Sequence, residues 1–201
     1  MIVLRAFSCA VLAAAVPAAA QDDTYPVTKV FEAFRDGCGS IENQEATSER
    51  LIASGWHKIE HEDLVGPLSE FVSHANQLGQ AAAAQEGAKV SELEAFENVV
   101  AGENVYIVLD EVSADGVRIS GCQLYDFGET RLIAPTMGEQ LLGREPDSVL
   151  DRPEIQRSEW TPGILPEHDS FKLFFVPPNS PVTEALKFSG LALMSDTVGA
   201  E

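Results

Sequence analysis

Residues 105–125 read VYIVLDEVSADGVRISGCQLY, two apolar runs joined by Ala114-Asp115-Gly116. The first run, Val105 to Leu109, is continuously apolar, which is typical of a central strand covered on both faces. Asp-Gly accepts the positive φ angles of a tight turn. We therefore expect the chain to turn back into a second strand, Val117 to Tyr125. This hairpin favours an antiparallel sheet in the C-terminal part of the chain.

Further strands are expected on both sides of this hairpin. Phe96 to Val100 reads as a strand, and residues 101–104 as the turn that leads from it into Val105. Phe171 to Val176 and Phe188 to Met194 are two more expected strands, joined by a proline-rich turn. Between these groups, Pro135 to Leu142 is expected to form a short helix, and residues 143–166, with several prolines, to be irregular.

Helical spacing of apolar residues prevails before residue 94. Thr28 to Asp36 and Asn43 to Ala53 are two expected helices, each followed by a glycine that stops it. A third begins at Pro67 and carries apolar residues at helical spacing as far as Leu78. The alanine-rich residues 79–87 are expected to fray into a surface connection.

Helices followed by strands favour an α+β fold. We expect a helical part over residues 26–87, packed on a C-terminal antiparallel sheet over residues 94–196. A mature chain of about 180 residues, running from 21 to 201, suits a single domain.

Residues 1–20 are predicted to be a cleavable secretory signal peptide. They carry one positive charge at Arg5, a short apolar run, and the small residues Ala18-Ala19-Ala20 before the expected cleavage site. The run is shorter than the roughly 20 residues of a membrane-spanning helix, and Cys9 stands too early in it for lipid attachment. The prediction is a periplasmic or secreted protein without an integral membrane anchor.

The chain is strongly acidic, with a formal net charge of −19 at pH 7. Such a surface repels nucleic acid phosphates and anionic lipid headgroups, so nucleic-acid binding is not expected. Two interpretations of the charge stay open. It serves solubility, or it attracts a basic partner such as a cationic enzyme that attacks the cell envelope.

Two cysteines follow the predicted signal peptide, Cys38 and Cys122. An even pair in an oxidising compartment is most simply a disulfide, which would tie the helical part to the sheet. The rival interpretation is a reactive thiol. It has little support because the chain has no C-x-x-C motif and Arg35 is the nearest basic residue to Cys38.

The string His57-Lys58-Ile59-Glu60-His61 matches H-x-x-E-H, with which inverted zinc peptidases present two imidazoles and a general base. On a helix the two histidines would share a face and could bind one zinc ion. Gly55-Trp56 just before the string suggests a helix end, and in a strand the histidines would lie about 13 Å apart. No metal site is therefore predicted, and His57, Glu60 and His61 stay as candidates for the alternative of a metal-dependent hydrolase.

Other chemical motifs are incomplete. His168 precedes Asp169 and Ser170, but sequence neighbours rarely form a catalytic triad. Phosphate-binding G-x-x-x-x-G-K-S/T and dinucleotide-binding G-x-G-x-x-G motifs are absent. The sequence predicts no catalytic residue and no cofactor.

A calcium site is suggested by three acidic residues near Gly116, namely Asp110, Glu111 and Asp115. An EF-hand aligned on this glycine would need a bidentate glutamate where Cys122 stands, so the segment is not an EF-hand. The acidic residues are expected to be ordinary parts of a turn.

A few positions spread over the chain form a spacing pattern: Phe31, Phe34 and Cys38, then Gly55-Trp56, residues 121–126, and Ser189-Gly190-Leu191. The pattern resembles small exported two-cysteine bacterial proteins of unknown function. The resemblance implies an exported α+β domain, and it implies no activity and no catalytic residue.

The function expected from the sequence is binding without catalysis. We expect an exported domain that binds a protein partner. The contact surface would be either its acidic face or a groove between helices and sheet. The alternatives are the metal-dependent hydrolase and a small-ligand carrier with an apolar pocket near Trp160, Phe174 and Leu191. Oligomeric state is not predicted.

Overall fold

The computed structural model describes residues 25–41, 43–131, 135–165 and 167–200. The predicted signal peptide and Cys9 lie outside these ranges. The described chain is a mixed α/β protein with one nine-stranded antiparallel sheet. None of the helices in the described ranges is long and apolar enough to cross a membrane.

The strands follow the order β1-β3-β4-β5-β9-β8-β7-β6, and β2 pairs with the far end of β4. Every pairing is antiparallel. The strands are β1 (His57–Ile59), β2 (Lys89–Val90), β3 (Glu94–Val100), β4 (Glu103–Ala114), β5 (Val117–Phe127), β6 (Ser148–Arg152), β7 (Ile155–Trp160), β8 (Ser170–Val176) and β9 (Gly190–Ala200). The predicted hairpin, β4 with β5, is near the middle of the sheet.

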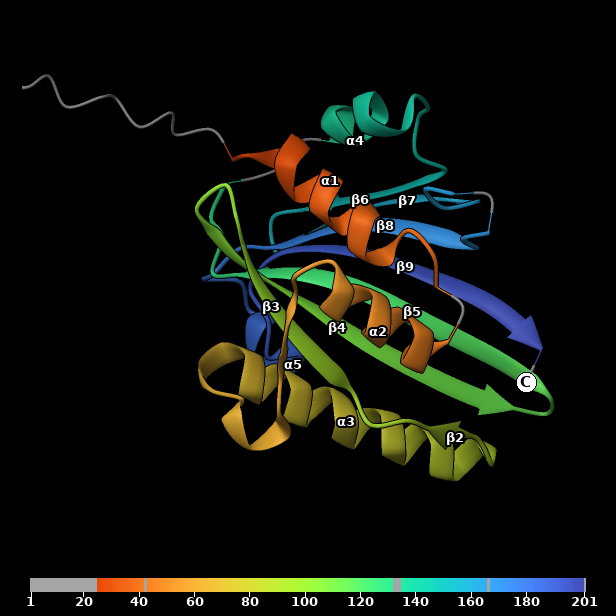
Figure 1. The fold of residues 1–201 in the computed structure, drawn as a ribbon. Helices are drawn as coiled ribbons and strands as arrows, with labels where there is room; N and C mark the ends of the chain where they lie inside the picture. Colours follow the sequence, from red (N-terminus) through yellow and green to blue (C-terminus); the bar gives the residue numbers. More distant parts are fainter. Residues whose placement is uncertain (1–24, 42, 132–134, 166, 201) are drawn as a thin grey trace, which may run out of the picture.

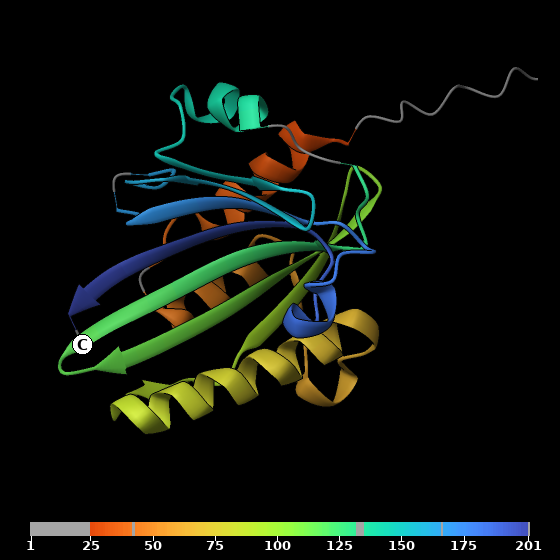
Figure 2. The same ribbon diagram turned by 180° about the vertical axis from the view of Figure 1, so that it is seen from behind.

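Helices lie on both faces of this sheet (Figures 1 and 2). They are α1 (Val27–Cys38), α2 (Gln44–Ala53), the 3-10 helix η1 (His61–Asp63), α3 (Gly66–Glu86), α4 (Pro135–Leu142) and α5 (Thr183–Leu186). Figure 1 shows α1 and α2 across one face, and Figure 2 shows α3 and α5 on the other.

Two apolar clusters hold these layers together. On the α1 face, Phe31 and Phe34 contact Phe171 of β8, with ring centroids 5.8 and 5.7 Å from its own. The Trp160 ring lies 5.5 Å from the same ring at a tilt of 34°. On the α3 face, Phe71 contacts Tyr125 of β5 at 4.7 Å. Because successive residues of a strand point to opposite faces, the central strands serve both clusters and are continuously apolar.

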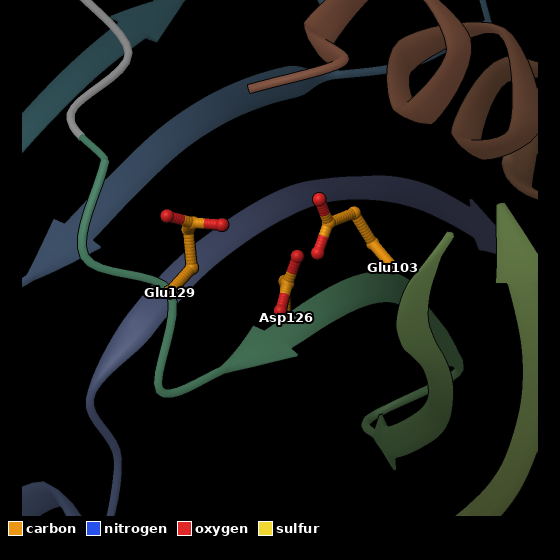
Figure 3. Close-up of side chains that lie close together, drawn as sticks. All are labelled: Glu103, Asp126 and Glu129. Carbon is orange, nitrogen blue, oxygen red and sulfur yellow. The ribbon is translucent and has the colours of Figure 1, made fainter. Parts of the chain in front are cut away.

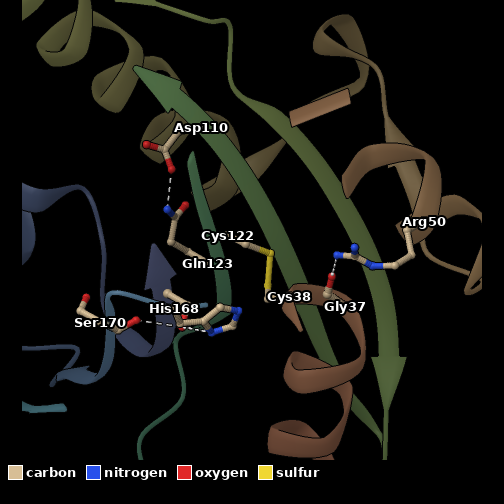
Figure 4. Close-up of a disulfide and its surroundings, with 9 residues drawn as sticks. Gly37, Cys38, Arg50, Asp110, Cys122, Gln123, His168 and Ser170 are labelled. Carbon is tan, nitrogen blue, oxygen red and sulfur yellow. Dashed lines mark hydrogen bonds between the residues drawn. A yellow bond between two sulfur atoms is a disulfide. The ribbon is translucent and has the colours of Figure 1, made fainter. Parts of the chain in front are cut away.

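The Cys38–Cys122 disulfide is confirmed (Figure 4). Its Cα atoms are 5.6 Å apart, within the usual range. Both cysteines are fully buried. The bond ties the C-terminal end of α1 to β5 in the centre of the sheet.

The turns follow the prediction. Asp115 and Gly116 both have positive φ, at 51° and 78°, as the Asp-Gly pair indicated for the β4–β5 turn. Ala101 and Gly102 form the β3–β4 turn in the same way, with φ of 52° and 94°.

Three sequence-based boundaries were wrong. The sheet begins at β1, inside the part expected to be only helical, and the short helix α5 lies between two strands where only a turn was expected. Residues 79–87 do not fray, because α3 continues to Glu86 and ends at Gly87 in a left-handed cap. Residues 143–166 contain the β6–β7 hairpin in place of an irregular stretch.

Two large apolar residues of the helices are exposed. Leu78 is 59% exposed because the second half of α3 extends beyond the apolar cluster, and Ile52 is 52% exposed on the outer side of α2.

Candidate functional site

A groove of about 750 Å³ lies between α2 and the sheet. The first half of α2 forms one wall, and β1 with the start of η1 forms the other. The link between β2 and β3 and two residues of the β4–β5 hairpin, Glu111 and Arg118, complete it. Its volume is typical of ligand sites, but no Phe, Tyr or Trp is among its lining residues. The groove therefore suits a polar ligand better than an aromatic one.

The first turn of α2 is fixed to the sheet. Asn43 begins the helix because its side chain accepts a hydrogen bond from a backbone N–H of that turn. The backbone N of Gln44 donates to Glu111 Oε2 at 3.1 Å. The Gln44 side chain donates to the Glu92 carbonyl at 2.7 Å and accepts from Ser91 Oγ. The α2 wall is thus tied to β4 and to the β2–β3 link.

The groove carries an excess of negative charge. Two cations line it, and each is paired with a carboxylate of the groove, Lys58 with Glu94 at 2.8 Å and Arg118 with Glu111 at 3.8 Å. Four further carboxylates line it, those of Glu45, Glu49, Glu60 and Glu92. A cationic ligand is attracted to such a surface, and an anionic one is repelled.

The structure places His57 in a strand, His61 in a 3-10 helix, and Glu60 between the two elements. His57 is in β1 and His61 begins η1, so the two imidazoles do not share the face of an α-helix. All three side chains are exposed. His61 Nδ1 lies 3.6 Å from Oε1 of Glu92. Glu60 and His61 line the groove, His57 does not, and the string does not form a zinc-peptidase arrangement.

Three carboxylates converge at the other end of the β4–β5 hairpin, and we call them the carboxylate cluster (Figure 3). Glu103 begins β4, Asp126 is near the end of β5, and Glu129 follows that strand. Their oxygens lie within 4.8 Å of one another. Within the described ranges no other three side chains of metal-ligating type are grouped so closely. The sequence did not indicate this cluster because its members come from separate stretches of chain.

Arg131 offsets part of the negative charge of the carboxylate cluster. Its Nη2 donates to Glu103 Oε1 at 2.7 Å and also to Glu129. The guanidinium lies 5.1 Å from the ring centroid of Tyr25, a cation–π distance, and Tyr25 Oη donates to Asp126 Oδ2 at 2.9 Å. With a guanidinium among the carboxylates, the cluster is an internal ion network that fastens the chain before α1 to the sheet.

Burial makes the carboxylates of this network unequal. Burial, with a smaller contribution from the charges of Glu129 and Glu103, raises the pKa of Asp126 to about 6, although the Tyr25 hydrogen bond and the charge of Arg131 oppose the rise. Burial also acts to raise the pKa of Glu129, but hydrogen bonds from Arg131 outweigh it, and that pKa is lowered. At neutral pH the network therefore depends on the positive charge of Arg131.

Arg131→Met is expected to lower the free energy of unfolding by about 2 kcal/mol, because it leaves partly buried carboxylates without their cation. Millimolar Ca²⁺ should restore part of the loss, since this ion prefers carboxylate oxygens. Thermal unfolding with and without Ca²⁺ measures both effects. The wild-type protein is the control, and an equal rise of Tm in both proteins would argue against this role of Arg131.

His168 does not form a triad with its sequence neighbours. Its imidazole is 1% exposed, and its Nδ1 lies 3.2 Å from Ser195 Oγ. Ser170 Oγ donates to Asp196 at 2.9 Å, and Asp169 accepts from a backbone N–H of β9. The three side chains have different partners, and the buried histidine offers no surface to a substrate.

The acidic residues of the β4–β5 hairpin also do not converge. Asp110 and Glu111 are neighbours in β4 and so point to opposite faces of the sheet. Asp110 accepts from Gln123, whereas Glu111 accepts from Gln44 and Ser120 in the groove. The structure thus assigns Glu111 to the groove and leaves no calcium loop at the turn.

The residues suggested for an apolar pocket belong to two clusters. Trp160 and Leu191 are fully buried in the cluster on the α1 face. Phe174 packs against the cluster on the α3 face. These three side chains fill the core on opposite sides of the sheet and do not line one cavity.

No protein-family model, curated protein or solved structure matches this chain. The resemblance to exported two-cysteine proteins stays a prediction. The case for a function therefore depends on the geometry and charge of the groove.

Proposed function

We propose that the protein is an exported, non-catalytic binding domain that holds a basic protein partner in the groove between α2 and the sheet. The observation that carries this proposal is the surplus of groove carboxylates over groove cations. Both cations are already paired, so the carboxylates of Glu45, Glu49, Glu60 and Glu92 are the groups that a partner's lysines and arginines would meet.

The location and organisation of the chain belong to the same proposal. The predicted signal peptide and the buried disulfide support export into an oxidising compartment, periplasmic or extracellular. We take residues 21–201 to be one domain, with α1 and α2 on one face of the sheet, because the apolar cluster on that face includes residues of both helices and of the central strands. A basic enzyme that degrades the envelope, of the lysozyme kind, has the charge such a partner needs.

The test must distinguish binding by the groove carboxylates from attraction by the net negative charge of the whole protein. A triple variant, Glu45→Lys, Glu49→Lys and Glu60→Lys, reverses three groove charges. The control triple, Glu86→Lys, Glu97→Lys and Glu145→Lys, changes the net charge equally at exposed positions outside the groove. If the groove is the contact, the first triple should weaken binding about 100-fold and the control only a few-fold.

The measurement is titration calorimetry with lysozyme as the first basic probe, followed by salt-gradient capture from an envelope extract. Affinity should fall as salt is raised, because exposed charges are screened. Equal losses in the two triples would show that only net charge matters. Absence of any specific basic partner at low salt would refute the proposal.

A further inference from the structure

The link between β2 and β3 is an open part of the sheet edge. β1 pairs with β3 only at residues 95–97, and β2 pairs with β4 at residues 89–90. On the side away from β4, no strand among those that the structure describes pairs with residues 91–94. The same residues line the groove. The groove therefore contains a stretch of backbone that a further strand could join.

Side-chain amides meet the outer carbonyls of this edge. Gln80 Nε2 of α3 donates to the Val90 carbonyl at 3.4 Å, and Gln44 Nε2 of α2 donates to the Glu92 carbonyl at 2.7 Å. A carbonyl at a sheet edge needs a hydrogen-bond donor, and an edge left open is a template for pairing with another chain. In the groove, the Gln44 amide thus takes the place that the N–H of a neighbouring strand would have.

The α2 wall of the groove presents carboxylates at a spacing that suits an extended chain. Glu45 and Glu49 are four residues apart in α2, so they lie on one side of the helix with a rise of about 6 Å between them. Alternate side chains of a strand point the same way and are about 6.6 Å apart. Both views of the fold show α2 running along β4 (Figures 1 and 2). A strand placed along the link can therefore direct two successive basic side chains at this wall.

We propose that the groove binds its partner through one extended basic segment, which pairs with the backbone of the β2–β3 link and directs alternate lysines or arginines at Glu45 and Glu49. An N–H of the segment replaces the Gln44 amide at the Glu92 carbonyl. This inference rests on the proposed function and narrows the partner to a basic protein with an exposed, extended segment. Main-chain hydrogen bonds then provide affinity, and the alternating charges provide specificity.

The test uses a short peptide in which lysine and threonine alternate, titrated into the oxidised protein at low salt. Two N-methylated forms of the peptide are compared, one methylated at the lysine nitrogens and the other at the threonine nitrogens. Successive N–H groups of a strand point to opposite edges, so only one of the two forms loses the donors that face the link. Both forms keep the charge and the side chains of the parent peptide.

One methylated form should bind at least about tenfold more weakly than the parent peptide, and the other within about threefold of it. The groove triple, Glu45→Lys, Glu49→Lys and Glu60→Lys, should weaken binding of the parent peptide at least tenfold, and the control triple only a few-fold. Calorimetry measures all of these affinities.

Equal affinities of the two methylated forms would overturn the inference, because attraction between charges does not depend on which edge of a strand is blocked. An edge-dependent loss that persists unchanged in the groove triple would also overturn it, since the peptide would then pair elsewhere. Lysozyme binding that depends on the groove, without peptide binding, refutes the extended segment and leaves the proposed function standing. Binding of neither probe refutes both.

Discussion

Replacing both Cys38 and Cys122 with alanine is expected to lower the free energy of unfolding by about 4.5 kcal/mol, one of the two largest effects predicted here. The two cysteines are 84 residues apart in sequence, so the bond removes much conformational freedom from the unfolded chain. It also joins the end of α1 to the central strand β5, where both sulfurs are buried. Urea denaturation of the two proteins measures the loss.

Reduction of the wild-type protein is the matched control for this variant. Reduced cysteines keep their volume, so the reduced wild type loses the cross-link without the cavities that alanine creates. A reductant should destabilise the wild type and leave the double variant unchanged. A loss below about 1 kcal/mol in the variant would mean that native packing alone holds α1 on the sheet.

Features specified by adjacent residues could be predicted from the sequence. The Asp115-Gly116 turn follows from the positive φ angles that these residues tolerate, and the structure has them. The helix Pro135–Leu142 was predicted with the bounds it has. The disulfide followed from the number of cysteines and the expected compartment.

Features that depend on distant partners were missed. The β6 strand, Ser148–Arg152, is at the edge of the sheet and mostly exposed, so its sequence lacks the alternation that identifies a half-buried strand. Pro153, taken as a sign of irregular structure, is in the turn between β6 and β7. The exposed half of α3 likewise continues through alanines with good helix propensity and no apolar face.

The residues of the groove could not be predicted from the sequence, although the acidic character of the protein surface could. Its carboxylates come from α2, from the segment after β1, from the β2–β3 link and from β4, and each alone looks like a solvated surface residue. Only the sheet register brings Glu111 under the first turn of α2. The histidine string matches a zinc-peptidase motif, yet only its residues 58–61 line the groove and His57 does not.

Gly190→Ala is the other substitution with a large expected effect. Gly190 begins β9 with φ of 120°, a conformation that side chains rarely allow. A Cβ there would overlap the Asp126 carbonyl oxygen and lie 2.9 Å from the Gly128 backbone N. Because both neighbours are backbone atoms, they cannot rotate away as a flexible side chain could. We expect a loss of about 3 kcal/mol or more in the free energy of unfolding.

Gly199→Ala is the matched control, because Gly199 is in the same strand and has no positive φ. The nearest atom to its added Cβ is Arg118 Nη2 at 3.8 Å, an ordinary contact. Its unfolding free energy should stay within about 0.5 kcal/mol of the wild type. If the two alanine variants lose equal stability in urea, the cause is a general property of β9. If only Gly190→Ala is unstable, the cause is the close approach of the β9 backbone to the backbone of Asp126, a member of the carboxylate cluster.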